Sequence, residues 1–433
     1  MMTGPRAVDE VVPLASALIR IDTTNLGDPD APGTERAAAE FVAEQLSDAG
    51  YDPDYVESGA PGRGNVVVRL PGADRDAGAL LIHGHLDVVP ADPAEWTVHP
   101  FSGEVRDGYL WGRGAVDMKG MVAMALAVAR QFRRDGTVPR RDLVFAFLAD
   151  EEAGGRVGSQ WLVENRHDLF EGVTEAIGEV GGYSVTLGGR RAYLVQVAEK
   201  TSFALSLAAH GRAAHGSMLH EDNPVARLAD AVARLDRHRF PVVLTDPVRA
   251  FLRGAASMLG TSDDPDVVVA RLGPLARLIG ATLRDTANVT MLRAGVKSNV
   301  VPSVARAEVD CRVLPGRREA FEREIVEVLG PGIEATWRHL PAWETPFDGP
   351  IVDAMGAAVT AEDPGARLLP YLLPAATDAK AFQRLGIRTF GFTPLRLPPE
   401  LDFSALFHGV DERVPVDALR FGVRVLERFL AEA

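Results

Sequence analysis

Histidines and a carboxylate interrupt an apolar stretch near residue 85. The segment LLIHGHLDVVP starts with aliphatic residues, and His83, His85 and Asp87 then follow at alternate positions. Alternate residues of a strand share a face, so His85 and Asp87 are expected to point the same way. A histidine that ligates a metal is commonly oriented by a carboxylate at its other ring nitrogen. The alternative for this pair is a core histidine beside a surface aspartate, and His83 by itself indicates only a core histidine.

Carboxylates gather in two further stretches. The apolar strand in FAFLADEEAGG ends in Asp150, Glu151 and Glu152. Adjacent carboxylates repel one another unless a cation or protons offset the charge, and α/β proteins place their sites at this end of a strand. A solvated acidic loop would have the same sequence. In WGRGAVDMKG, Asp117 precedes an expected helix, where it either reaches into a cleft or caps the helix.

Glu179 in AIGEVGGY and His408 in LFHGVDERVP complete the set of candidate ligands. Imidazole and carboxylate ligands without cysteine suit Zn²⁺, Mn²⁺ or Co²⁺. These candidates exceed what one tetrahedral zinc needs, whereas two metals that share a bridging carboxylate would use them all.

The composition limits the class of protein. The chain has 433 residues and a formal net charge of −14, which argues against nucleic acid or an anionic membrane as a partner. Cys311 is the only cysteine, so no disulfide can form within the chain. The first ten residues lack a leader-peptide pattern, and the longest apolar run, GMVAMALAVA, is expected to be a buried helix. These features predict a cytoplasmic protein.

Helices and short apolar strands alternate in the first part of the chain, which predicts an α/β fold with a mainly parallel central sheet flanked by helices. Strands are expected at residues 65–70, 79–84 and 142–148, and helices at 37–49 and 121–132. After Gly188 the pattern changes to paired strands around a helix at 224–237. We therefore predict a discontinuous catalytic domain, residues 1–188 and 315–433, and an inserted α+β domain, residues 189–314. The connection at 241–285 is long and must carry its own helices.

The order of the motifs resembles a known family. GHLDVVP, GRGAVDMKG, DEEAGG, GEVGG and FHGVDE match the di-zinc metallopeptidases that include aminoacylase, carboxypeptidase G, acetylornithine deacetylase and succinyl-diaminopimelate desuccinylase. The resemblance covers nearly the whole chain. It implies an inserted domain that acts as a lid and dimerises, and it implies a cis peptide bond after Asp117.

The resemblance also implies roles for the motif residues. The implied ligands of two divalent metals, most simply Zn²⁺ with Co²⁺ or Mn²⁺ as alternatives, are His85, Asp117, Glu152, Glu179 and His408. Asp117 would bridge both metals, Asp87 would orient His85, and Glu151 would be the general base.

Further implied roles belong to the inserted domain and one loop. His215 would reach the active site of a partner subunit and stabilise the oxyanion, so the resemblance implies a homodimer. Asn299 and Arg312 would hold the carboxylate of the substrate, although a turn asparagine and a surface arginine are equally good explanations. Thr377 and Asp378 would line the substrate pocket.

The expected function is hydrolysis of the amide bond of an N-acyl amino acid, or of a dipeptide with a free carboxylate, by a metal-activated water. A narrow biosynthetic deacylase of the acetylornithine or succinyl-diaminopimelate type is the alternative, and a metal-binding protein without catalysis is a third hypothesis. The segment at residues 266–283 is expected either to line an apolar acyl pocket or to pack as an amphipathic helix.

Overall fold

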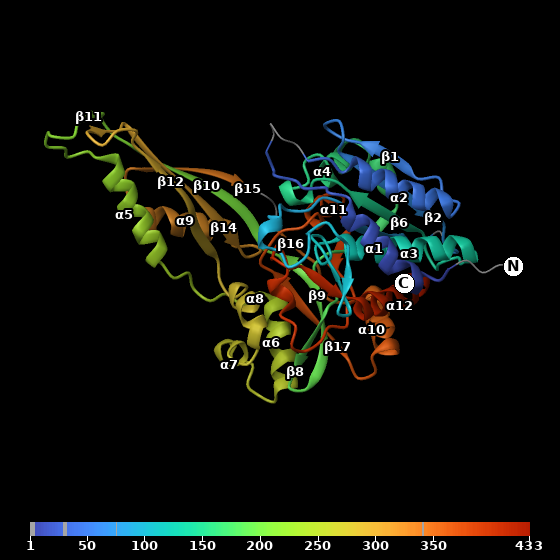
Figure 1. Cartoon of the computed structure of the whole chain (residues 1–433). Helices are drawn as coiled ribbons and strands as arrows, with labels where there is room; N and C mark the ends of the chain where they lie inside the picture. The colour runs from blue at the N-terminus through green and yellow to red at the C-terminus, as the bar shows by residue number, and fades with distance from the viewer. Residues whose placement is uncertain (1–4, 29–32, 75, 340–341) are drawn as a thin grey trace.

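A large three-layer unit and a small two-layer unit make up the protein, as a computed structural model shows (Figure 1). The structure describes residues 5–28, 33–74, 76–339 and 342–433. The small unit projects from the large one, and β11 (Ala214–His215) lies at its far tip. The mixed α/β architecture with an inserted unit confirms the expected fold class.

The large sheet has the order β1-β2-β6-β3-β7-β18-β9-β16, with β8 and β17 paired to β9. Its strands are β1 (Asp54–Glu57), β2 (Gly64–Leu70), β3 (Ala79–His85), β6 (Leu143–Leu148), β7 (Val173–Gly178), β8 (Ser184–Leu187), β9 (Arg190–Glu199), β16 (Trp343–Glu344), β17 (Arg367–Leu373) and β18 (Arg388–Gly391). The central strands β6, β3, β7 and β18 run parallel. Their C-terminal ends therefore meet at one edge of the sheet.

Side chains alternate between two helical layers. Leu80 and Ile82 of β3 face one cluster, and Leu81 faces the other. The first layer holds α1 (Ala7–Arg20), α2 (Arg36–Asp48), α3 (Lys119–Asp135), α10 (Pro350–Glu362) and α12 (Val416–Glu432). The second layer holds α4 (Ser159–Asn165) and α11 (Ala379–Gln383). Burial on both faces explains why these strands are almost continuously apolar.

The expected elements of the large unit are confirmed in place. The apolar run at residues 120–129 is the buried core of α3. Among the described residues, no helix combines the length and the apolar character that crossing a bilayer requires. A three-stranded sheet of β4 (Val105–Arg106), β5 (Tyr109–Trp111) and β19 (Arg413–Pro415) joins the loop before Asp117 to the segment after His408.

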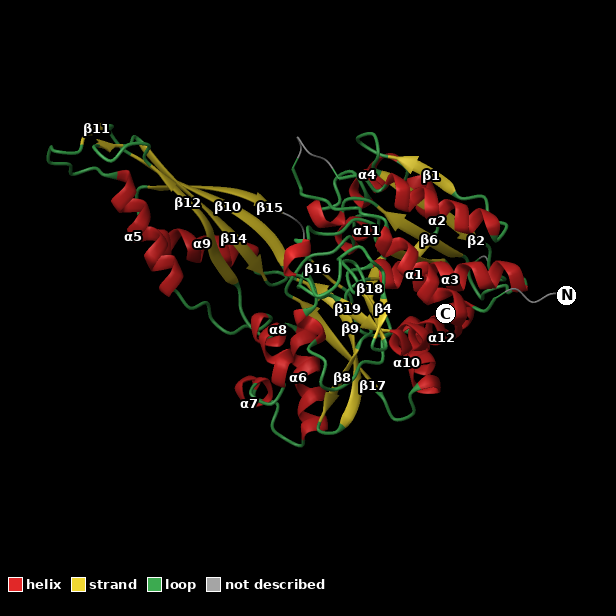
Figure 2. Cartoon of the chain, in the orientation of Figure 1, coloured by secondary structure: helices red, strands yellow, loops and turns green. Residues whose placement is uncertain are grey.

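The small unit is a four-stranded antiparallel sheet covered on one face by α5 (Pro224–Arg237) and α9 (Arg318–Leu329) (Figure 2). The strand order is β12-β14-β10-β15, from β10 (Thr201–His210), β12 (Thr286–Ala294), β14 (Val304–Val313) and β15 (Ile333–His339). A short pair, β11 and β13 (Val300–Val301), forms its tip.

The limits of the inserted unit differ from those expected from the sequence. β9 falls within the expected inserted domain of residues 189–314, but it pairs with β17 and β18 of the large sheet. At the other side, α9 and β15 belong to the small unit although they follow residue 314. Local strand patterns do not show which sheet a strand joins, because that choice depends on pairing between distant residues.

The long connection forms α6 (Asp246–Leu259), α7 (Pro265–Val269) and α8 (Ala276–Ala281), and it returns to the large unit. Phe251, Leu252 and Ile279 are buried in the main core of the large unit. The connection therefore packs on the large unit and not on the small one.

Buried ionic groups occupy the junction of the two units. Lys200 lies between β9 and β10, and its Nζ donates to the carbonyl of Arg284 at 2.6 Å. The buried Asp285 carboxylate accepts from the Leu314 amide at 2.8 Å and from Arg317 Nε at 3.1 Å. These contacts join three segments that pass between the two units, and one of these segments directly follows β14, the strand that carries Arg312.

Phe321 anchors the core of the small unit, because its fully buried ring lies close to the rings of Phe203, Phe240 and Trp337. We predict that Phe321→Ala lowers the free energy of unfolding by about 3–5 kcal/mol, as for other buried phenylalanines. Urea unfolding measures this change. Val326→Ala on the exposed side of the same helix is the matched control, and an equal loss in both variants would contradict the packing described here.

Candidate metal centre

Three neighbouring strands deliver polar side chains to one edge of the large sheet. His85 is the last residue of β3, Glu151 and Glu152 follow β6, and Glu179 directly follows β7. Because β6, β3 and β7 are adjacent and parallel, these residues converge outside the carboxyl ends of the strands. Sites in open α/β sheets form at this edge, so the location agrees with the sequence-based expectation.

Two loops bring the remaining candidate ligands. Asp117 lies just before α3, and the peptide bond between Asp117 and Met118 is cis, as the resemblance implies. His408 follows the short helix η5 (Phe403–Ala405) and has a left-handed backbone with φ 57°. Its side chain is half exposed, whereas Asp117 is buried.

The candidate ligands form two groups of three that share Asp117. One group is His85, Asp117 and Glu179, and the other is Asp117, Glu152 and His408. In each group the ligand atoms lie within 4.8 Å of one another. Such an arrangement fits two cations bridged by one carboxylate.

Distances within the groups show how Asp117 joins them. Its Oδ1 lies 3.0 Å from His85 Nε2, and its Oδ2 lies 3.3 Å from His408 Nε2. His85 Nε2 is also 3.4 Å from Glu179 Oε2, and His408 Nε2 is 3.2 Å from Glu152 Oε2. One carboxylate oxygen of Asp117 therefore faces each group.

The residues present fit divalent metal ions. They are imidazole nitrogens and carboxylate oxygens, the donors that Zn²⁺, Mn²⁺ and Co²⁺ accept. Within the described chain, the buried Oε1 of Glu152 has no hydrogen-bond partner. A buried carboxylate oxygen without a partner is costly, and a bound cation would remove that cost.

The electrostatics of the site also favour bound cations. Burial, followed by repulsion from Glu179, raises the pKa of Glu151 well above its usual range. Burial raises the pKa of Glu179 to about 8. Hydrogen bonds to Asp117 and Glu152 raise the pKa of His408 to about 10. Clustered negative charge of this kind is unfavourable without positive charge nearby, which favours the binding of cations.

Asp87 contacts His85 through both its backbone and its side chain. His85 Nδ1 lies 2.9 Å from the backbone carbonyl of Asp87 and 3.5 Å from its Oδ1, so Nε2 faces Asp117. The fully buried Asp87 carboxylate also accepts from the amides of Glu151 and Glu152, both at 3.1 Å. One carboxylate therefore fixes the ligand of β3 and the loop after β6.

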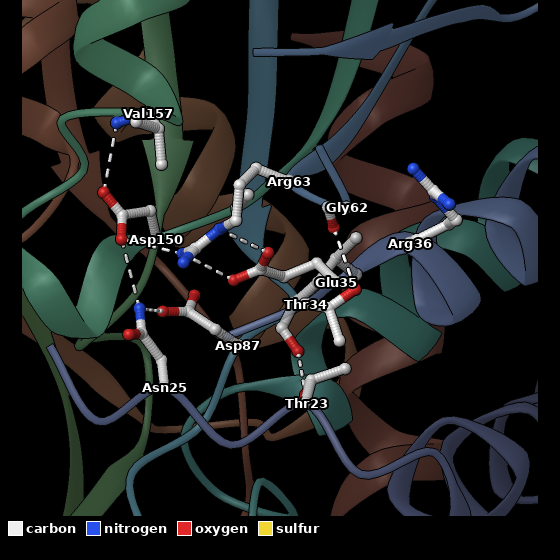
Figure 3. Close-up of polar contacts among 12 residues, drawn as sticks. Thr23, Asn25, Thr34, Glu35, Arg36, Gly62, Arg63, Asp87, Asp150 and Val157 are labelled. Carbon is white, nitrogen blue, oxygen red and sulfur yellow. Dashed lines mark hydrogen bonds and ion pairs between the residues drawn. The ribbon is translucent and has the colours of Figure 1, made fainter. Parts of the chain in front are cut away.

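Asp150 serves the structure rather than the metal groups (Figure 3). Its Oδ1 accepts from Arg63 at 2.7 Å, and its Oδ2 accepts from the Val157 amide at 3.0 Å. Asn25 Nδ2 donates to both Asp150 and Asp87, at 3.1 Å and 2.9 Å. Asn25 and Arg63 could not be recognised from the sequence, because each is a common residue type far from the motifs in the chain.

Glu412 is a further buried carboxylate that sequence analysis missed. It accepts from the amides of Gly114, Val116 and Asp117 at 2.6–3.0 Å and from Arg113 at 2.7 Å. It thereby fastens the loop that carries Asp117 to the segment that carries His408. The signal was present in FHGVDERVP, four residues after His408, but an acidic residue in a loop is ordinarily solvated.

A cavity of about 450 Å³ opens onto both metal groups. Glu151 lines it but belongs to neither group. The cationic residues Arg312 and Lys380 line it as well. Arg312 was expected from the sequence, whereas Lys380 was not; Lys380 is buried and lies in the segment AATDAKAF.

Thr377 and Asp378, which were also expected to contact the substrate, lie outside this cavity. Thr377 donates from its hydroxyl and its amide to the buried Glu199, and Asp378 accepts from Ser159 Oγ. Neither residue lines the cavity, although residues 373–376 do.

His215 and Asn299 lie together at the far tip of the small unit, away from the metal groups (Figure 1). Both residues are exposed, and His215 Nδ1 lies 2.7 Å from Ser217 Oγ. A single chain therefore does not bring either of them to its own site.

Two curated proteins illustrate the likeness to known sequences. N-fatty-acyl-amino acid synthase/hydrolase PM20D1 of Xenopus tropicalis is 26% identical over 445 residues, which cover 96% of this chain and 84% of that protein. Aminoacylase-1 of Sus scrofa is 27% identical over 404 residues, which cover 91% of this chain and 89% of that protein.

Solved structures share the fold. The M20 family metallo-carboxypeptidase Sso-CP2 from Sulfolobus solfataricus has a TM-score of 0.74 at 19% identity, covering 98% of this chain and 99% of that one. The Bacillus subtilis YXEP protein, described as a dinuclear metal binding peptidase, has a TM-score of 0.62 at 14% identity, with 98% of each chain covered.

The sequence matches peptidase family M20/M25/M40 over residues 81–432, well over half of the chain. That range contains every candidate metal ligand described above. The chain therefore belongs to peptidase family M20/M25/M40, a family of metal-dependent hydrolytic enzymes.

Proposed function

We propose that the protein is a two-metal amidohydrolase that cleaves the amide bond of N-acyl amino acids, or of dipeptides with a free carboxylate. The observation that carries this proposal is the pair of three-residue groups that share Asp117 and open onto one cavity with Glu151. The two curated relatives named above are an N-fatty-acyl-amino acid synthase/hydrolase and an aminoacylase, which supports the same substrate class.

His85, Asp117 and Glu179 would hold one metal, and Asp117, Glu152 and His408 the other. The donor set suits Zn²⁺ best, with Co²⁺ and Mn²⁺ as alternatives. Divalent metals bound there supply Lewis-acid polarisation and lower the pKa of water towards neutrality. Asp87 holds His85 with Nε2 turned to the site, which keeps the tautomer that a ligand needs.

Glu151 is proposed as the general base. Its side chain makes no hydrogen bond within the described residues, and it lines the cavity beside both groups. It can therefore accept a proton from the attacking water and pass it to the leaving amine nitrogen. Its amide donates to Asp87, which fixes the backbone from which the carboxylate reaches into the cavity.

Arg312 and Lys380 are proposed to bind the free carboxylate of the substrate. Both line the cavity, and one comes from each unit of the protein. The planar guanidinium of Arg312 suits a carboxylate, although Nε already contacts Asp310 at 2.9 Å. The carboxylate of the substrate would then lie between Arg312 on β14 of the small unit and Lys380 on α11 of the large unit.

A homodimer would place His215 at the active site of the partner. The edge strand β12 is largely exposed, so its backbone is open to pairing. Met218, Leu219 and Val296 are exposed apolar residues near the tip that carries His215. Exposed apolar side chains around a histidine are typical of a surface that is covered in an assembly.

Chelation and Glu151→Gln test the function together. On a panel of N-acyl amino acids and dipeptides supplied with zinc, we expect hydrolysis that a chelator abolishes. We expect Glu151→Gln to keep two equivalents of metal and to lose about 10²–10⁴-fold in kcat, because only proton transfer is removed. Mass spectrometry follows the products, and metal analysis checks the loading. Near wild-type turnover in Glu151→Gln would disprove the assigned base.

His408→Ala tests the second metal group. Because this group then keeps only Asp117 and Glu152, we predict that the purified variant holds about one equivalent of metal instead of two. Elemental analysis after dialysis measures the content. His167→Ala, on an exposed histidine outside the site, is the control. Two retained equivalents in His408→Ala would remove His408 from the ligand set.

A mixing experiment tests whether His215 acts in the partner subunit. Glu151→Gln and His215→Ala should each be nearly inactive alone. Subunits mixed and re-associated in equal amounts should recover up to about a quarter of wild-type activity, because half of the dimers combine both chains and one of their two sites is intact. Sedimentation confirms the dimer. If mixing restores nothing although mixed dimers form, His215 does not act in trans.

A further inference from the structure

Buried polar side chains connect the N-terminal part of the chain to the turn that carries Glu151 (Figure 3). Each is at most 5% exposed. Because buried polar groups need partners, the positions of linked side chains depend on one another. We call this set the Arg63 network, and its members are linked in the order Glu35, Arg63, Asp150, Asn25 and Asp87.

Arg63 holds two carboxylates at once. Its Nη2 donates to Glu35 Oε1 at 2.8 Å and to Asp150 Oδ1 at 2.7 Å, and its Nε lies 2.8 Å from Glu35 Oε2. The two contacts with Glu35 form a bidentate pair, which fixes the plane of the guanidinium. Glu35 is fixed in turn, because its amide donates to the carbonyl of Gly62 at 3.0 Å. The guanidinium therefore sets the place of the Asp150 side chain.

Asn25 joins Asp150 to Asp87. Its Nδ2 donates to Asp150 Oδ1 at 3.1 Å and to Asp87 Oδ2 at 2.9 Å. A carboxamide nitrogen carries two hydrogens, so one hydrogen serves each carboxylate and the amide sets the separation of the two. Without this shared donor, two buried like charges would lie close together and would move apart.

The backbone of Asn25 is held beside the segment that contains Asp87. Its amide donates to the carbonyl of Val88 at 2.9 Å, and the Val88 amide donates to the carbonyl of Thr23 at 3.2 Å. Thr23 Oγ1 also donates to the carbonyl of Leu86 at 2.7 Å. The carboxamide of Asn25 therefore occupies a fixed place relative to the Asp87 carboxylate.

The Arg63 network holds the turn of Glu151 from two directions. Asp150 directly precedes Glu151 and has a left-handed backbone with φ 71°. The Asp87 carboxylate accepts from the amides of Glu151 and Glu152, both at 3.1 Å. The Glu151 side chain lines the cavity that opens onto both metal groups. A shift of either aspartate would therefore move the base relative to that cavity.

We propose that Asn25 and Arg63 are positioning residues for Glu151. Through Asp87 and Asp150 they hold the turn from which the Glu151 carboxylate meets the attacking water, so they act on kcat and not on substrate binding. This proposal rests on the proposed function, in which Glu151 is the general base. Proton transfer needs the base within hydrogen-bonding distance, and a displacement of about 1 Å costs about 10²-fold in rate.

Asn25→Ala removes the shared donor without adding a charge. On the metal-loaded enzyme with N-acetyl- and N-decanoyl-L-phenylalanine as probes, we expect kcat to fall by about 10–10²-fold while two equivalents of metal remain. KM should change by less than about twofold, since the groups that bind the substrate are untouched. Asn165→Ala, on an exposed asparagine, is the matched control. An unchanged kcat, or a loss of kcat that follows loss of metal, would overturn the proposal.

Combination with Glu151→Gln shows whether Asn25 acts through the base. With the base already removed, the further change Asn25→Ala should lower kcat by less than about twofold, because effects of coupled residues are not additive. If the two losses multiply in full, Asn25 acts elsewhere and the proposal fails. An active Glu151→Gln enzyme, or a wild-type enzyme that hydrolyses neither probe, would count against the proposed function and against this proposal with it.

Arg63 variants separate positioning from stability. Arg63→Met leaves Glu35 and Asp150 buried without their cation, so thermal stability and kcat should both fall. Adding Glu35→Gln and Asp150→Asn removes these charges and should recover stability without kcat, whereas Arg63→Lys keeps a cation and should recover part of kcat. Arg36→Met, on an exposed ion pair with Glu57, is the matched control.

The two roles of Arg63 predict different outcomes. If kcat returns together with stability in the combined variant, Arg63 only stabilises the fold and its assignment is wrong. Should Arg63→Met fail to fold, Asn25→Ala still decides the question, because that change leaves the ion pairs of Arg63 in place.

Discussion

Four carboxylates that repel one another are held together at one edge of the large sheet. Asp117, Glu151, Glu152 and Glu179 converge on one edge of the sheet, where all four line the same cavity. Left without cations, such a cluster binds protons, and the raised pKa values of Glu151 and Glu179 express this. The site is therefore built for positive charge, and the two groups that share Asp117 are the natural places for it.

The surrounding structure keeps the cluster from relaxing. Asp87 and Glu412 are also buried carboxylates, and both accept hydrogen bonds from backbone amides of the loops that carry the candidate ligands. Asp150 is neutralised by Arg63 and bridged to Asp87 through Asn25. These contacts hold the loops rigidly, so the ligands cannot swing apart to reduce their repulsion. Groups that are already positioned in the folded protein bind more tightly, because less conformational entropy is lost on binding.

Division into two units explains how one site can serve both metal binding and substrate selection. The large unit contributes all candidate ligands and Glu151, together with the apolar wall of the cavity. The small unit contributes Arg312 near the junction, while it carries His215 far from the site of its own chain. Completion of the site by a partner subunit would make assembly a condition of activity.

The strand ends, the motif residues and the class of the enzyme can be predicted from the amino-acid sequence. Short apolar strands that end at His85 or just before Glu151 and Glu179 depend on local pattern. Parallel strands gather their C-terminal ends at one edge. The match to the family confirms the class of the enzyme.

Tertiary structure alone decided which sheet receives β9 and β15, because strand pairing depends on residues far apart in the chain. For the same reason it alone revealed Asn25, Arg63, Glu412 and Lys380, whose residue types are ordinary. The tertiary structure also gives different partners to Asp150 and Glu152, which are close in sequence. Asp150 pairs with Arg63, whereas Glu152 lies beside Asp117 and His408. Such roles follow from long-range contacts that fold the chain, and no local pattern encodes them.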